Sequence, residues 1–119
     1  MRVPCTDVSA QYGKEGKGLL RAVETVFSKG DFVLGQAVET LEKRFAELCA
    51  APFAVGVGSG TDALVLALKA LGIGPGDEVI TVPNSWVSTA SCIALVGARP
   101  VFVDVADDLN INPECIELA

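Results

Sequence analysis

Histidine is absent from this sequence of 119 residues. Its absence excludes Ser-His and Cys-His nucleophilic catalysis and removes a common ligand of zinc. The four cysteines form no CxxC pair, so we expect free thiols in a reducing compartment and no metal site: Cys5, Cys49, Cys92 and Cys115. Any chemistry must therefore come from carboxylates, hydroxyls, lysines or a bound cofactor.

Positive charge and long apolar runs are also scarce. The 9 basic residues against 15 acidic ones give a net charge of −6, which argues against nucleic acid as a partner. The longest apolar run, ALVLALKALGIG, is interrupted by Lys69 and is too short to span a bilayer, and the N-terminal residues include no apolar signal segment. With 50% apolar residues, the sequence predicts a packed, soluble, cytoplasmic protein without a membrane partner.

Two helices are predicted after an irregular lead-in over residues 1–17. The first runs from about Gly18 to Ser28, because the Lys29-Gly30 pair is typical of a helix end. The second runs from about Gln36 to Cys49, where apolar residues recur at steps of three and four: Val38, Leu41, Phe45 and Leu48. Together they form a predicted helical segment over residues 18–50.

Strands and helices are predicted to alternate over residues 51–112. The strands are FAVGVG, EVITV and PVFVDV, and the helices are TDALVLALKALG and the segment from Ser85 to Val96. This βαβαβ order predicts an α/β fold with a parallel sheet. Asn112 and Pro113 then predict the start of a helix over residues 113–119. A helix of this length is too short to be stable alone, so the sequence looks truncated.

The stretch VGVGSGTDAL, which begins at Val55, places a glycine-rich turn between a strand and a helix. Such a turn exposes backbone N–H groups at the positive end of the helix dipole and favours a phosphate group. The alternative is a tight structural turn in which Ser59 or Thr61 caps the helix. The turn also matches the GxGxxA form of the dinucleotide fingerprint, but EVITVPNS ends without the acidic residue that holds the ribose.

Trp86, the single tryptophan, follows the second predicted strand. Because loops after parallel strands gather at one edge of a sheet, its ring can face the glycine turn. A flat aromatic ring beside a phosphate site suits a planar phosphorylated heterocycle, and packing in a core or an interface is the alternative.

The order of these motifs resembles the amino-terminal part of the DegT/DnrJ/EryC1/StrS family, the pyridoxal-phosphate-dependent sugar aminotransferases. The resemblance runs from about Tyr12 to Glu114 through FVLGQAVETLEKRFAEL, AVGVGSGTDALVLALKALGIGPGDEVITVPNSWVSTA, GARPVFVDV and NINPE. It implies a portion of the large domain of fold-type I enzymes, with pyridoxal 5'-phosphate as cofactor and nucleotide sugars and amino acids as substrates of the intact enzyme. It also implies homodimers with active sites at the interface.

The resemblance assigns site residues to the turn and to the segment after the second strand. Gly60 and Thr61 hold the cofactor phosphate with help from Ser59, Trp86 stacks on the pyridine ring, and Ser88 and Thr89 have supporting roles. No residue of this chain is assigned a catalytic role. The lysine that forms the Schiff base and the aspartate that pairs with the pyridinium nitrogen lie beyond residue 119 in the family, so we expect the chain alone to be inactive.

The resemblance bears on assembly as well. In the family's sheet, later strands separate the strand before the glycine turn from the next two strands. We therefore expect unpaired strand edges, an uncovered apolar face, and a homo-oligomer or a partner chain that supplies the missing domain. The alternatives are a non-enzymatic interaction protein that keeps the oligomer-forming surface, and a dinucleotide-binding module.

Overall fold

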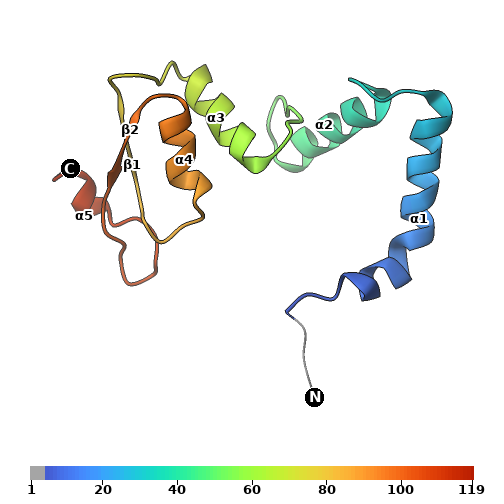
Figure 1. Cartoon of the computed structure of the whole chain (residues 1–119), viewed down its shortest axis with the longest axis horizontal. Helices are drawn as coiled ribbons and strands as arrows, with labels where there is room; N and C mark the ends of the chain where they lie inside the picture. Colours follow the sequence, from blue (N-terminus) through green and yellow to red (C-terminus); the bar gives the residue numbers. More distant parts are fainter. Residues whose placement is uncertain (1–4) are drawn as a thin grey trace. The chain divides into compact units, whose positions relative to one another are not determined.

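A pair of parallel strands forms the sheet of this protein, for which a computed structural model describes residues 5–119. The strands β1 (Glu78–Thr81) and β2 (Arg99–Phe102) are joined by the crossover helix α4 (Ser88–Leu95), as Figure 1 shows. The register places Glu78 opposite Arg99, and the two side chains form an ion pair. The α/β class with a parallel sheet is thus confirmed, with two strands in it.

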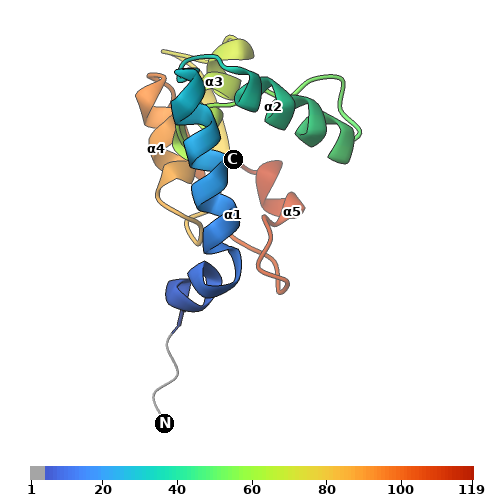
Figure 2. The ribbon, with the colours of Figure 1, turned by 90° about the vertical axis from the view of Figure 1, so that its right-hand side faces the viewer.

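The core lies between α4, the sheet and α3 (Gly60–Ala70). Helix α4 packs against both strands and α3 packs against α4, and the two helices lie side by side in Figures 1 and 2. Ile93 is the most deeply buried of the core side chains, at 2% exposure. Its buried neighbours are Cys92, Val96 and Ala98, and the half-buried side chains packed on them are Val65, Leu68, Ile73 and Val79.

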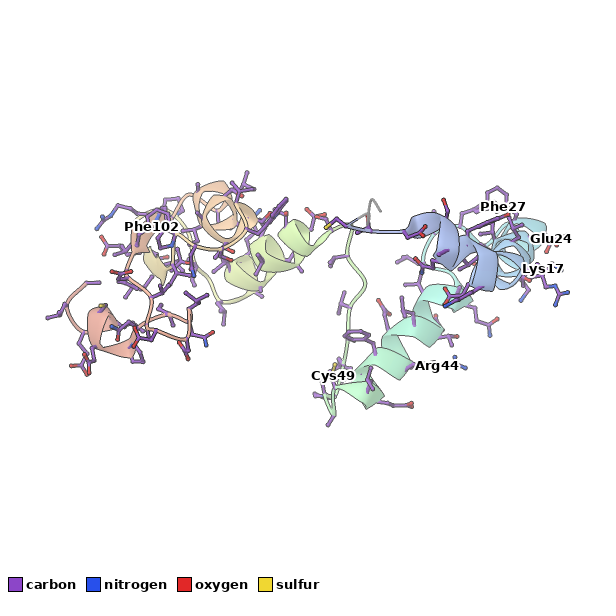
Figure 3. The ribbon with its side chains drawn as sticks, turned by 90° about the horizontal axis from the view of Figure 1, so that it is seen from below. Lys17, Glu24, Phe27, Arg44, Cys49 and Phe102 are labelled. Atoms are coloured by element: carbon purple, nitrogen blue, oxygen red, sulfur yellow. The ribbon has the colours of Figure 1, made fainter. Side chains whose placement is uncertain are left out.

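The chain divides between Gly56 and Val57 into two units, and the first consists of helices without a comparable core. It contains α1 (Val8–Lys29) and α2 (Gln36–Leu48), close to the second predicted helix. Ala46 is the one buried apolar side chain among its described residues. Phe27, labelled in Figure 3, projects from α1 and is 67% exposed. No helix within residues 5–119 has the length and apolar character needed to cross a membrane.

Helix α1 begins at Val8 and not at Gly18, so the predicted irregular lead-in was wrong from residue 8 onward. Residues 1–4 of that lead-in lie outside the described residues. Asp7 starts the helix, because its side chain accepts a hydrogen bond from the Ala10 N–H at 3.0 Å. Three glycines lie within the helix: Gly13, Gly16 and Gly18. At Gly16, the Tyr12 ring covers the backbone so closely that a Cβ there would lie 2.7 Å from a ring carbon.

The strand predicted from FAVGVG is absent: residues 53–58 form no strand, and the observed order is βαβ and not βαβαβ. A strand needs a neighbour to satisfy its N–H and C=O groups, and β1 and β2 pair only with each other in residues 5–119. The Gly56 N–H instead donates to the Glu42 carboxylate at 2.7 Å. The apolar side chains therefore lie exposed, Phe53 at 84% and Val55 at 79%.

The remaining boundaries differ from the predictions by a few residues. Helix α4 begins at Ser88 and not at Ser85, because residues 85–87 form the turn in which the Thr89 N–H bonds the Trp86 carbonyl. Strand β2 ends at Phe102, and Val105 then forms an isolated antiparallel bridge with Ile111. The Asn112 cap is confirmed, since its side chain accepts from the Glu114 N–H, and α5 (Pro113–Ile116) follows.

Asp108 organises the loop between Val105 and Ile111. Its carboxylate accepts hydrogen bonds from the side-chain amide of Asn110 and from the Asn110 backbone N–H, both at 3.0 Å. These bonds stabilise the charged form, and they hold the pKa of Asp108 below its ordinary value of 3.8, with the side-chain bond as the larger cause. The stabilisation they give the folded loop is present at neutral pH and is lost as the pH falls through this lowered pKa.

We predict that Ile93→Ala destabilises the second unit by about 2–5 kcal/mol, because it leaves a cavity in a small core. The matched control is Leu95→Ala on the same helix, where the side chain is 65% exposed. The control should change the free energy of unfolding by less than about 0.5 kcal/mol. Urea denaturation followed by circular dichroism measures both, and equal effects would contradict the described core.

We also predict that Asn110→Ala raises the pKa of Asp108 part of the way to 3.8, since the variant removes the side-chain bond and keeps the backbone bond. A carboxyl-carbon NMR titration measures this pKa directly. Asn112→Ala is the control, because Asn112 caps α5 and does not bond Asp108. A pKa that rises equally in both variants would contradict the assigned cause.

Candidate functional site

The glycine turn ends in a regular N-cap at Ser59. Ser59 has extended backbone angles, and its hydroxyl accepts from the Asp62 N–H at 3.1 Å. Its carbonyl accepts from the Ala63 N–H at 3.0 Å. Of the two possible capping residues, the structure therefore selects Ser59 and leaves the Thr61 hydroxyl available for another contact.

Two backbone donors at this turn have no acceptor. Within residues 5–119, neither the Gly60 N–H nor the Thr61 N–H forms a hydrogen bond. They lie in the first turn of α3, where the helix dipole contributes about half a positive charge. The space beside Gly60 is open, since a Cβ built there meets no atom within 4 Å. The turn thus offers donors, favourable potential and room for an anion.

The Thr61 hydroxyl contacts the start of α4. Thr61 Oγ1 lies 2.8 Å from Ser88 Oγ, and both residues are half-buried. This distance is that of a normal O–H···O hydrogen bond. Since the two residues are 27 positions apart, the bond depends on how α3 packs on α4.

The remaining predicted site residues are Trp86, on the turn that precedes α4, and Thr89, in the first turn of α4. Thr89 Oγ1 lies 2.9 Å from Ser85 Oγ, so its hydroxyl contacts Ser85 and not the glycine turn. Trp86 is 76% exposed, which leaves a ring face free. It lines a cavity of about 320 Å³ together with Pro83 and Phe102, among others.

A carboxylate crowds the other side of the turn. The Asp62 Oδ2 atom lies 2.8 Å from the position that a Cβ on Gly58 would occupy. A side chain at residue 58 would require this flexible carboxylate to shift. The negative charge therefore sits beside Gly58, whereas the unpaired N–H donors belong to Gly60 and Thr61.

Asn84 is a residue of this edge that the sequence predictions did not include. Its side-chain amide donates to the Leu109 carbonyl at 3.1 Å and ties the segment after β1 to the loop after β2. The position of Asn84 after a predicted strand could have indicated this, because segments that follow parallel strands meet at one edge of a sheet. Asn84 also lines a cavity of about 400 Å³ with Thr81 and Asn110, among others.

These residues fit a phosphorylated planar cofactor. The open space at Gly60, the two unpaired N–H groups and the Thr61 hydroxyl provide donors for phosphate oxygens. Trp86, whose ring is exposed, lies two residues before Ser88 in the sequence. The Ser88 hydroxyl contacts Thr61. A metal ion has no comparable site, since residues 5–119 contain no cluster of three or more Cys, Asp or Glu side chains able to hold one.

Comparisons with known proteins identify relatives over nearly the whole chain. The model of the DegT/DnrJ/EryC1/StrS aminotransferase family matches residues 14–119. A pleiotropic regulatory protein of Geobacillus stearothermophilus is 42% identical over 120 residues, which cover 100% of this chain and 32% of that protein. A dTDP-3-amino-3,4,6-trideoxy-alpha-D-glucose transaminase of Micromonospora megalomicea is 43% identical over 92% of this chain and 29% of its own length.

Solved structures agree with these relatives. DesV of S. venezuelae, in complex with a ketimine intermediate, has a TM-score of 0.94 and 39% identity, and the match covers 98% of this chain and 32% of DesV. The ntda protein of Bacillus subtilis, with bound cofactor PMP, has a TM-score of 0.90 and 32% identity, with 99% of this chain and 28% of ntda covered.

The chain therefore spans about a third of the length of the curated relatives it matches, 32% and 29%. Over that third, the family match covers residues that include the glycine turn, Trp86 and Ser88. The sequence match and the structural likeness agree on one assignment. The chain belongs to the DegT/DnrJ/EryC1/StrS aminotransferase family.

Proposed function

We propose that this chain carries the cofactor-phosphate site of a pyridoxal-phosphate-dependent aminotransferase that acts on nucleotide sugars. The observation that carries the proposal is the turn at Gly60 and Thr61. Its two backbone N–H groups have no acceptor within residues 5–119, and a Cβ built on Gly60 meets no atom within 4 Å. A phosphate group would satisfy both donors at the positive end of α3.

Five of the six predicted site residues have a role in this proposal. Gly60 and Thr61 bind phosphate oxygens through their N–H groups, and the Thr61 hydroxyl adds a third donor. Ser59 holds the turn through its bond to the Asp62 N–H, and its own hydroxyl proton is free to assist. Trp86 stacks on the pyridine ring, and Thr89 supports it by bonding Ser85 on the same turn.

Pyridoxal 5'-phosphate, when bound, supplies the electron sink for moving an amino group between two substrates. The substrates we propose are an amino acid donor, commonly glutamate, and a keto-sugar nucleotide acceptor. Support comes from the family assignment and from the dTDP-sugar transaminase among the relatives. This chain's own contribution is to bind and orient the cofactor by its phosphate and its ring.

The lysine that anchors the cofactor is proposed to come from outside this chain's residues. All five lysines of the chain are exposed, and none matches the lysine motif that the resemblance implies: Lys14, Lys17, Lys29, Lys43 and Lys69. We propose that further residues or a partner chain supply this lysine and the aspartate for the pyridinium nitrogen. The chain alone then binds the cofactor without transferring an amine.

We place this function in the cytoplasm and in an oligomer. The cysteines of residues 5–119 are free, which is typical of a reducing compartment. Apolar side chains that repeat along one helix, such as Leu20, Val23 and Phe27 of α1, are more than half exposed. A second copy or a partner chain that covers them would remove this surface from water.

The proposed function predicts saturable quenching of Trp86 fluorescence when the chain is titrated with pyridoxamine phosphate. Trp86 is the single tryptophan, so the signal reports one site. Thr61→Val should raise the concentration for half-saturation about tenfold or more, because a hydroxyl donor to a charged phosphate is lost while the side-chain shape is kept.

Thr40→Val is the matched control, since the Thr40 hydroxyl bonds the Gln36 carbonyl within α2. It should leave the titration unchanged, and pyridoxamine without its phosphate should bind far more weakly. Absence of saturable quenching up to millimolar ligand would contradict the proposal.

A non-enzymatic interaction protein is the second candidate, and the exposed apolar side chains of α1 and α2 favour it. It predicts tight self-association, measured by analytical ultracentrifugation, with no affinity for pyridoxamine phosphate. The two functions are therefore separated by whether the cofactor binds, and not by whether the chain oligomerises.

A further inference from the structure

The hydroxyl pair between α3 and α4 raises the question of which oxygen donates. Thr61 Oγ1 and Ser88 Oγ lie 2.8 Å apart, and within residues 5–119 neither forms another hydrogen bond. Each hydroxyl has one proton to donate and two lone pairs to accept with. One of the two protons is therefore used in the bond, and the other is left without an acceptor.

An anion at the glycine turn selects between the two arrangements. If Thr61 donates to Ser88, its proton is used in that bond, and the Thr61 hydroxyl cannot donate to the anion. If Ser88 donates to Thr61, the Thr61 proton is free to bond a phosphate oxygen, and the two bonds in series polarise each other. The second arrangement is therefore the one in which the Thr61 hydroxyl can donate to an anion held on the Gly60 and Thr61 N–H groups.

We propose that Ser88 is a positioning residue, whose hydroxyl donates to Thr61 Oγ1 and directs the Thr61 proton to the cofactor phosphate. The inference rests on the proposed function, because it requires a phosphate at the glycine turn. It assigns Ser88 an indirect role, through Thr61, in place of a contact with the cofactor.

The position of Ser88 in its helix excludes capping of α4 as the role of its hydroxyl. The N-cap of α4 is Val87, which makes no side-chain capping bond, and Ser88 is the first helical residue. The Ser88 hydroxyl is therefore not needed to cap α4. The contact with Thr61 is the one hydrogen bond that its side chain makes within the described residues.

Ser91 provides a matched control on the same helix. It is half-buried, one turn further along α4, and its hydroxyl forms no hydrogen bond within residues 5–119. Ser91→Ala thus makes the same chemical change in the same helix without touching the turn.

The test is the affinity of the whole chain for pyridoxamine phosphate, followed by Trp86 fluorescence. We expect Ser88→Ala to weaken binding about three- to tenfold, the loss typical of one hydrogen bond. Ser91→Ala should bind as the unsubstituted chain does, and Ser88→Thr, which keeps a hydroxyl, should restore affinity to within about twofold. Circular dichroism of each ligand-free variant checks that it is folded.

A double-mutant cycle distinguishes an indirect role from a direct one. In a Thr61→Val background, Ser88→Ala should cause no further loss, because the residue it acts through is already gone. Additive losses would show that Ser88 binds the phosphate itself and would overturn the inference. Unchanged affinity in Ser88→Ala would overturn it too, while leaving the proposed function in place. If the unsubstituted chain fails to bind, the proposed function fails, and this inference fails with it.

Discussion

Helices α3 and α4 meet through apolar side chains, with Val65 and Leu68 of α3 packed on a cluster that includes Ile93 of α4. This contact fixes the relative position of the two helix starts. The Thr61 and Ser88 hydroxyls come within 2.8 Å as a result, although they are far apart in sequence. The same packing holds α3, whose Gly60 and Thr61 N–H groups have no acceptor within residues 5–119. The candidate site therefore depends on a small hydrophobic core more than on any polar bond.

Features set by neighbouring residues could be predicted from the sequence. The turn before α3, the second helix and the Asn112 cap follow from local propensity and capping chemistry. Features that depend on residues far away in the sequence could not be predicted in this way. Residues 53–58 have strand-like composition but no pairing neighbour within residues 5–119. The turn was predicted as a phosphate site, but the bond from Thr61 to Ser88 required the packing of two helices.

Burial is unequal between the two units, and this bears on where function resides. The second unit has a core around Ile93, whereas the helices of the first leave side chains such as Phe27 and Leu48 exposed. The chain spans about a third of the relatives' length, 32% and 29%, so each relative is much longer than the part that matches this chain. The proposed cofactor site lies within the packed unit. Phosphate binding at the turn can therefore be tested independently of what covers the helices of the first unit.

Amide-resolved NMR can test whether the Gly60 and Thr61 amides bind the cofactor phosphate. We would record ¹H–¹⁵N spectra of the chain while adding pyridoxamine phosphate, and repeat the titration with pyridoxamine. We expect the largest downfield shifts at the Gly60 and Thr61 amides, and only with the phosphorylated ligand. Shifts that are centred elsewhere, or equal for both ligands, would contradict this binding.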